Sequence, residues 1–241
     1  MKIKRIPVTL LALIVLVSAF VFPIRAEDGA AWDGSSTATP AGSGTAADPY
    51  RISSGAELKW FSDKVGEKVA ILYAVLTADI DLGGAEWTPI GAAVPFAGSF
   101  DGRGFTVSGF RVTGAERAGL FSALRGATVR NLTVDRAELV TASAATGFGG
   151  ALAGVAEGAT VCNVTVGENV TVRGYNVGGL IGRTQGDVSS LTFCVSAATV
   201  QTDGAIAGEA AGGIVGLCGA ADLGDCINRG NVTAVGSGEQ L

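Results

Sequence analysis

The chain has 241 residues with 22 acidic and 17 basic side chains, so its formal net charge is −5. An acidic chain repels nucleic acid, and we expect no nucleic-acid partner. The sequence contains no histidine, which excludes Ser-His-Asp and Cys-His catalysis and every metal site that uses imidazole. Glycine occurs 37 times, about twice its usual share. Helices tolerate glycine poorly, so the composition predicts an all-β fold with many tight turns.

The segment 1–26 is typical of a secretion signal. Basic side chains at its start precede an apolar stretch from Val8 to Phe22, and the small residue Ala26 can serve as the cleavage point. The apolar stretch is shorter than the roughly 20 residues that span a bilayer. We therefore expect a cleaved signal peptide at 1–26, no membrane contact after cleavage, and a protein that is secreted or held at the cell surface.

The next segment, residues 27–47, is rich in Gly, Ala, Ser and Thr, which predicts a flexible linker from which Trp32 can dock onto the domain. A short helix over residues 53–65 follows, since Ser54 and Glu57 fit a capping box. Its apolar face comprises Leu58, Phe61 and Val65. We expect this helix to cap the first coil of a β structure whose open edge would otherwise invite aggregation.

Residues 48–117 are predicted to hold this helix and the first β coils. Asp79 and Asp81 are two positions apart on an alternating strand, so their carboxylates would share one face. Such a pair can run glycoside hydrolysis or bind calcium, although a solvated strand face explains it better. The segment 101–104, Asp-Gly-Arg-Gly, is similar to a cation-binding or integrin-type loop, and a tight turn explains it at least as well.

From position 118 onward, glycine-flanked apolar clusters recur, centred on Leu120, Leu152, Leu180 and Ile214. A second apolar position follows each cluster at a similar interval. The period of roughly 30 residues is typical of stacked units that bury their apolar faces only against their neighbours. The structural repeat positions are Gly119, Leu120, Leu132, Leu152, Gly154, Val164, Gly178, Gly179, Leu180, Gly182, Cys194, Gly212, Gly213, Ile214, Gly216 and Cys226.

The clusters at 178–182, Gly-Gly-Leu-Ile-Gly, and 212–216, Gly-Gly-Ile-Val-Gly, resemble GLUG repeats of bacterial surface and secreted proteins, including adhesin-like proteins and non-catalytic regions of immunoglobulin A metalloproteases. The segments at 47–52, 78–82, 87–91 and 98–102 are similar to the region that often precedes such repeats. The resemblance covers about residues 46–241, and Ala118 and Ala151 depart from its glycine pattern. It implies a right-handed parallel β-helix with a display or adhesion role and carries over no catalytic residue.

Two further residue types recur in the repeat region, 118–241. Four Asn-x-Thr tripeptides begin at Asn131, Asn163, Asn169 and Asn231, and we expect stacked asparagines that hydrogen-bond along the solenoid axis. The four cysteines are Cys162, Cys194, Cys218 and Cys226. Because Cys194 and Cys226 take the places of Leu132 and Val164, buried thiols are favoured, with one disulfide or a metal site as the open alternatives.

These observations favour a non-enzymatic surface repeat module with a display, adhesion or spacer role and no cofactor or metal. Its expected partner is a glycan or a protein on a host or cell surface. Two alternatives stay open: an accessory region of a larger secreted protease and a carbohydrate-active β-helix enzyme. The last repeat looks incomplete, so the rest of a longer chain is expected to be missing.

Overall fold

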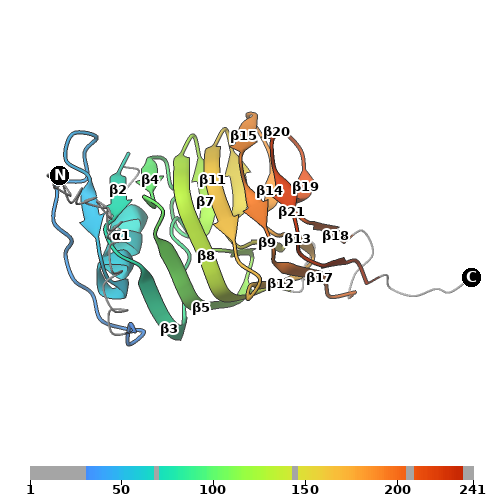
Figure 1. Ribbon diagram of the computed structural model, residues 1–241, viewed down its shortest axis with the longest axis horizontal. Coiled ribbons are helices and arrows are strands. Elements are labelled where there is room, and N and C mark those ends of the chain that lie inside the picture. The colour runs from blue at the N-terminus through green and yellow to red at the C-terminus, as the bar shows by residue number, and fades with distance from the viewer. Residues whose placement is uncertain (1–30, 68–70, 143–145, 205–208, 236–241) are drawn as a thin grey trace, which may run out of the picture.

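The computed structural model describes residues 31–67, 71–142, 146–204 and 209–235. The chain forms a parallel β-solenoid whose coils follow one another along the long axis of the molecule (Figure 1). This confirms the all-β parallel solenoid expected from the repeats and the glycine content. The predicted signal peptide, 1–26, lies outside the described residues.

In the described residues the strands form three sheets. The largest contains β1 (Tyr50–Ile52), β2 (Tyr73–Leu76), β3 (Ile80–Glu86), β4 (Ser99–Asp101), β5 (Thr106–Ala115), β8 (Thr128–Thr141), β11 (Thr160–Val166), β12 (Thr171–Gly174), β15 (Ser189–Thr192), β16 (Val195–Ser196), β17 (Thr199–Thr202), β20 (Ala221–Gly224), β21 (Ile227–Asn228) and β22 (Val232–Thr233). The second contains β7 (Phe121–Arg125), β10 (Ala153–Glu157), β14 (Ile181–Thr184) and β19 (Val215–Cys218). The third contains β6 (Arg117–Ala118), β9 (Phe148–Gly150), β13 (Asn176–Gly178) and β18 (Ala210–Gly212).

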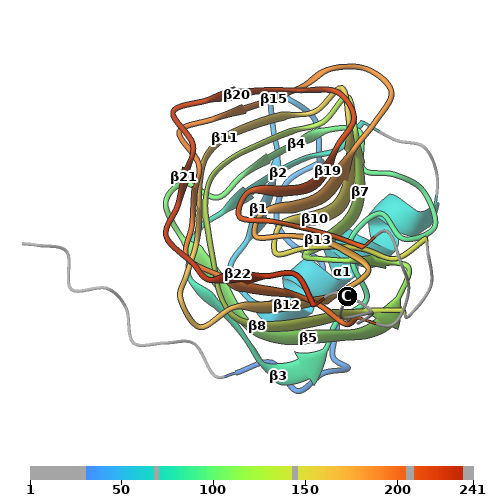
Figure 2. The ribbon, with the colours of Figure 1, turned by 90° about the vertical axis from the view of Figure 1, so that its right-hand side faces the viewer.

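The large sheet bends around the solenoid, so that one coil contributes to more than one side of it. Seen along the axis, β15 and β20 lie along the top of the coil, β21 along its left side, and β12 and β22 along the bottom (Figure 2). The other two sheets close the coil, and the turns that join them carry the repeat leucines. Equivalent residues of successive coils therefore form columns parallel to the axis, which is the arrangement that positions the candidate site.

The helix α1 (Gly55–Glu67) begins and ends two positions later than predicted. The Ser54 hydroxyl accepts a hydrogen bond from the Glu57 N–H at 3.3 Å, as a capping box requires. The Glu57 carboxylate instead accepts from the N–H of Ser53 at 2.7 Å, one position before the expected donor. The predicted apolar face is buried, with Leu58, Phe61 and Val65 each at most 3% exposed.

The predicted flexible linker is wrong for residues 31–47, which pack against the solenoid. Trp32 is 7% exposed, its backbone N–H donates to the Asp81 carbonyl at 3.0 Å, and its ring packs edge-on against Trp87. Farther along, Ala41 forms a β-bridge with Arg51. A low-complexity composition predicts too little apolar burial for order, but one buried tryptophan and a series of backbone hydrogen bonds hold this segment.

Close backbone approach explains the glycines of the repeat motif. A Cβ on Gly178 would lie 2.0 Å from the Ile181 carbonyl oxygen, and one on Gly182 would lie 2.6 Å from the Gly149 nitrogen. Only glycine fits at such positions. The turn between these two glycines carries Leu180 into the core, where it is fully buried. The motif therefore joins two strands at a tight turn whose apolar tip fills the coil.

The first repeat departs from the alignment that places Leu120 and Leu152 at equivalent positions. Ala118 pairs with Gly149, not with Gly150, whereas Phe121 pairs with Ala153. Phe121 lies three positions after Ala118, but Ala153 lies four positions after Gly149, so the first turn is one position shorter. Alanine therefore replaces glycine in the coil whose turn is one position shorter.

Candidate functional site

The two carboxylates considered as a catalytic or calcium-binding pair serve the scaffold. Asp79 lies one position before strand β3, and Asp79 and Asp81 are both half-buried on either side of the buried Ile80. Asp79 Oδ1 accepts from the Thr106 N–H at 2.7 Å. The Asp81 carboxylate accepts from the Gly83 N–H at 2.9 Å and forms an ion pair with Arg136 at 3.0 Å. Both groups thus join neighbouring segments of the solenoid.

The segment 101–104 forms the predicted tight turn, closed by a bond of 2.8 Å from the Phe105 N–H to the Gly102 carbonyl. Asp101 is tied into the scaffold, since its carboxylate accepts from the Arg103 N–H at 2.9 Å and from Asn131 Nδ2 and Arg130 Nε, each at 3.0 Å. Burial alone would raise the pKa of Asp101, but these hydrogen bonds and the Arg130 charge together hold it below its usual value.

Replacing Asp101 by asparagine should reduce the pH dependence of stability between about pH 5 and pH 3. A carboxyl group with a lowered pKa stabilises the fold above its unfolded-state pKa of about 4, and that contribution is lost as the pH falls through the folded-state value. Thermal melts at both pH values should show a larger drop for the native chain than for Asp101→Asn. Asp222→Asn, at an exposed position, controls for the loss of one negative charge. Equal drops in the native chain and in Asp101→Asn would contradict the assignment.

One corner of the solenoid carries a column of residues in the left-handed region, with φ between 52° and 54°: Asn131, Asn163, Phe193 and Asp225. Asn163 Nδ2 donates to Asn131 Oδ1 at 2.9 Å, which confirms the predicted stacking for this pair. Asn169 lies elsewhere, 3.5 Å from the Asp135 carboxylate. Phe193 interrupts the column and is 60% exposed, a feature that sequence reasoning missed.

The four cysteines are free thiols in differing surroundings. Cys194 is fully buried, and burial raises its pKa to about 12, so this thiol is a poor nucleophile. Cys162 and Cys226 are half-buried. Cys218 is exposed, which contradicts a buried thiol at that position. Within the described ranges, no three His, Cys, Asp or Glu side chains are grouped as a metal site would require.

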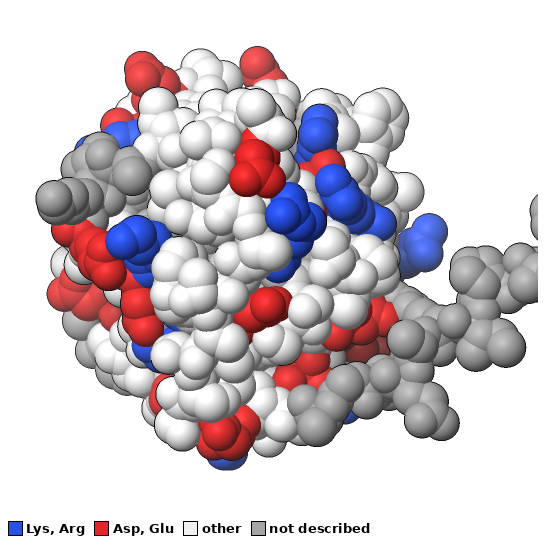
Figure 3. All heavy atoms as spheres, turned by 90° about the vertical axis from the view of Figure 1, so that its left-hand side faces the viewer, with Lys and Arg blue, Asp and Glu red and all other residues white. Residues whose placement is uncertain are grey.

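Charged side chains of both signs appear on the end of the solenoid that carries α1 (Figure 3). Several form pairs between residues close in sequence, such as Lys64 with Glu67 at 2.6 Å and Arg51 with Asp48 at 2.8 Å. Exposed pairs of this kind contribute little to stability and are typical of a solvated surface.

A groove of about 500 Å³ lies along the next corner, where one coil has a longer corner than the two coils that follow it. Five positions separate Val166 from Thr171, whereas three separate their partners Ser196 and Thr199. The longer corner projects as a wall that carries Glu168, and the shorter corners leave a hollow beside it. This corner groove is lined by Thr165, Val166, Gly167, Glu168, Val195, Ala197, Thr199, Arg229, Gly230 and Asn231.

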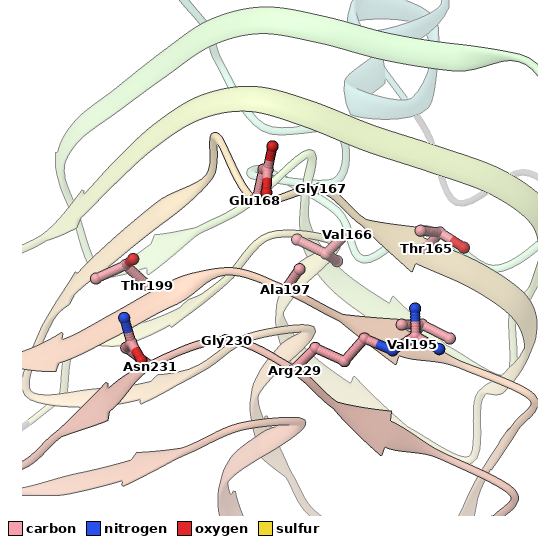
Figure 4. Close-up of a pocket in the computed structure, with 10 residues that line it drawn as sticks. All are labelled: Thr165, Val166, Gly167, Glu168, Val195, Ala197, Thr199, Arg229, Gly230 and Asn231. Atoms are coloured by element: carbon pink, nitrogen blue, oxygen red, sulfur yellow. The ribbon is translucent and has the colours of Figure 1, made fainter.

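The groove combines an apolar floor with polar groups at its margins (Figure 4). The Arg229 side chain extends toward Val195, while Thr199 and Asn231 lie together on the opposite side. Glu168 rises from the wall. The wall depends on Gly167, because a Cβ there would lie 2.1 Å from Asp135 Oδ1. Such a surface offers hydrogen-bond donors and acceptors around a small apolar patch.

Comparison with known proteins gives distant relatives, and no family model matches the chain. It is 36% identical over 164 residues to halomucin of Haloquadratum walsbyi, which covers 63% of this chain and 2% of halomucin. It is 32% identical over 159 residues to the "Putative Gly-rich membrane protein" of Evansella cellulosilytica, which covers 63% of this chain and 18% of that protein. The chain thus spans a small part of the length of either relative.

A solved structure of similar outline is the crystal structure of "a putative immunoglobulin A1 protease" from Bacteroides ovatus. It is 14% identical, covers 81% of this chain and 85% of its own, and gives a TM-score of 0.44. In the part of the chain that the structure describes, no helix has the length and apolar character needed to cross a membrane.

Sequence reasoning did not find the corner groove. Its polar residues come from three coils and share no motif, and Arg229 has no equivalent in the preceding coils. The signal that was present is the difference in corner length, which appears only when Val166 is aligned with Ser196 and Thr171 with Thr199.

Proposed function

We propose that this chain is a region of an exported, non-enzymatic surface protein whose solenoid serves display or adhesion. The observation that carries the proposal is the structural use of its candidate catalytic and cation-binding acids. Asp79, Asp81 and Asp101 all accept backbone hydrogen bonds within the scaffold. A glycoside hydrolase instead needs two carboxyl groups that face one another across a bound sugar.

The relatives support a surface location. One is named halomucin and the other a Gly-rich membrane protein, and each is far longer than the matched region. The basic and apolar pattern of residues 1–26 supports export. A solenoid suits display because each coil packs only on its neighbours, and an array can lengthen without a new core. The protease-accessory and carbohydrate-active alternatives stay predictions.

The location is tested with the full chain carrying a carboxyl-terminal epitope tag in a bacterial host. On intact cells or in the medium, added protease should remove the tag while a cytoplasmic marker stays whole. Val15→Arg, which places a charge inside the apolar stretch, should keep the tag inside the cell. A tag protected until lysis in the native chain contradicts the proposal, and so does polysaccharide cleavage by the purified chain.

A further inference from the structure

We infer that the corner groove binds a neutral glycan chain, with Phe193 as the surface on which a sugar ring stacks. This inference rests on the proposed surface function and adds to it a ligand class and a site.

Among the described non-glycine residues with positive φ, Phe193 is the aromatic one, and the others are Asn, Asp and two arginines, Arg103 and Arg136. The φ of Phe193 is 54°, and the residues before and after it in the column are Asn163 and Asp225. A bulky side chain is rare in this left-handed region, because Cβ crowds the backbone, whereas Asn and Asp tolerate it. The ring gains little burial in return, since the residue is 60% exposed. Strain that packing does not offset indicates a functional constraint.

Phe193 lies close along the chain to the groove lining. Phe193 stands two positions before Val195, which lines the groove, and Cys194 between them is buried. An exposed aromatic side chain two positions from a groove with an apolar floor suits the C–H face of a sugar ring.

The polar lining fits sugar hydroxyls, each of which both donates and accepts. Glu168 supplies acceptors, Arg229 supplies donors, and Asn231 supplies both. The hydroxyls of Thr165 and Thr199 add groups that can act either way. One acidic and one basic side chain balance each other, which favours an uncharged ligand.

The geometry disfavours the two other common kinds of chain. A peptide strand binds to a sheet through an open edge, but strand β16 pairs with β11 on one side and β21 on the other. A nucleic acid needs a basic stripe, whereas Arg229 is the only basic residue in the groove lining. A glycan needs neither feature.

The test uses the purified full chain on an array of neutral and anionic oligosaccharides, followed by calorimetry with the neutral one that binds best. Phe193→Asn should weaken binding about tenfold, because the stacking surface is lost. Its melting temperature should not fall, since asparagine suits the left-handed backbone and matches Asn163 below it. Asn231→Ala should also weaken binding about tenfold.

The matched control is Val188→Asn, which exchanges another exposed apolar side chain outside the groove and should leave the affinity unchanged. The inference is overturned if no neutral oligosaccharide binds, if only anionic ones bind, or if both groove variants bind like the native chain. A lower melting temperature for Phe193→Asn would assign the ring to packing and overturn its stacking role. If no glycan binds but the tag is exposed on cells, the glycan site is wrong and the surface function stands. If the tag is protected, the surface function is wrong, whatever the glycan result.

Discussion

Replacing Gly178 by alanine should lower the free energy of unfolding by about 3 kcal/mol and the melting temperature by about 10 °C. The new methyl group would lie 2.0 Å from the Ile181 carbonyl oxygen and 2.6 Å from the Gly216 nitrogen. Both are backbone atoms held by strands β14 and β19, so neither can move aside without breaking the pairing of adjacent coils. Thermal and urea unfolding, followed by circular dichroism, measure the loss.

The same exchange at Gly66 is the matched control. That glycine lies in α1, and a Cβ there would meet no atom within 4 Å. Alanine is the better helix former, so Gly66→Ala should stabilise the chain by about 0.5 kcal/mol. If Gly178→Ala and the native chain have the same melting temperature and the same urea midpoint, the turn is not as tight as the structure shows.

The general fold could be predicted from the sequence because the same turn and core residues recur in successive coils. The glycine clusters at 178–182 and 212–216 mark the tight turns, and their regular recurrence marks stacked coils. Leu132 and Val164 pair across the coils, and the register continues the column through Cys194 to Cys226, as the spacing predicts.

What the sequence could not show depends on register and on single residues. The shorter first turn at Ala118 appears only from strand pairing, and so does the longer corner that carries Glu168. Nothing in an aromatic side chain signals a left-handed backbone at Phe193. The order of residues 31–47 rests on the burial of Trp32 against Trp87. The composition of the whole segment does not reveal the effect of this single residue.

Replacing Phe61 by alanine should destabilise the chain by about 4 kcal/mol, the loss typical of a fully buried phenylalanine. Phe61 is 0% exposed, and its ring lies 5.9 Å from the ring of Phe96, 6.0 Å from that of Phe100 and 6.3 Å from that of Tyr50. These rings join α1 to the first coils of the solenoid. Without this contact α1 should detach and leave the apolar end of the first coil exposed to water, so the variant should also aggregate on heating.

The nearby position Lys64 provides the control, because its side chain is 40% exposed and pairs with Glu67 at the helix surface. Lys64→Ala keeps helix propensity high and should change stability by less than about 0.5 kcal/mol. Hydrogen exchange distinguishes the two variants further: Phe61→Ala should lose protection first in β1 and β2, while β11 and β15 keep theirs. Uniform loss across all coils would contradict a capping role for α1, since a solenoid that stacks coil on coil should open first at the end that has lost its cover.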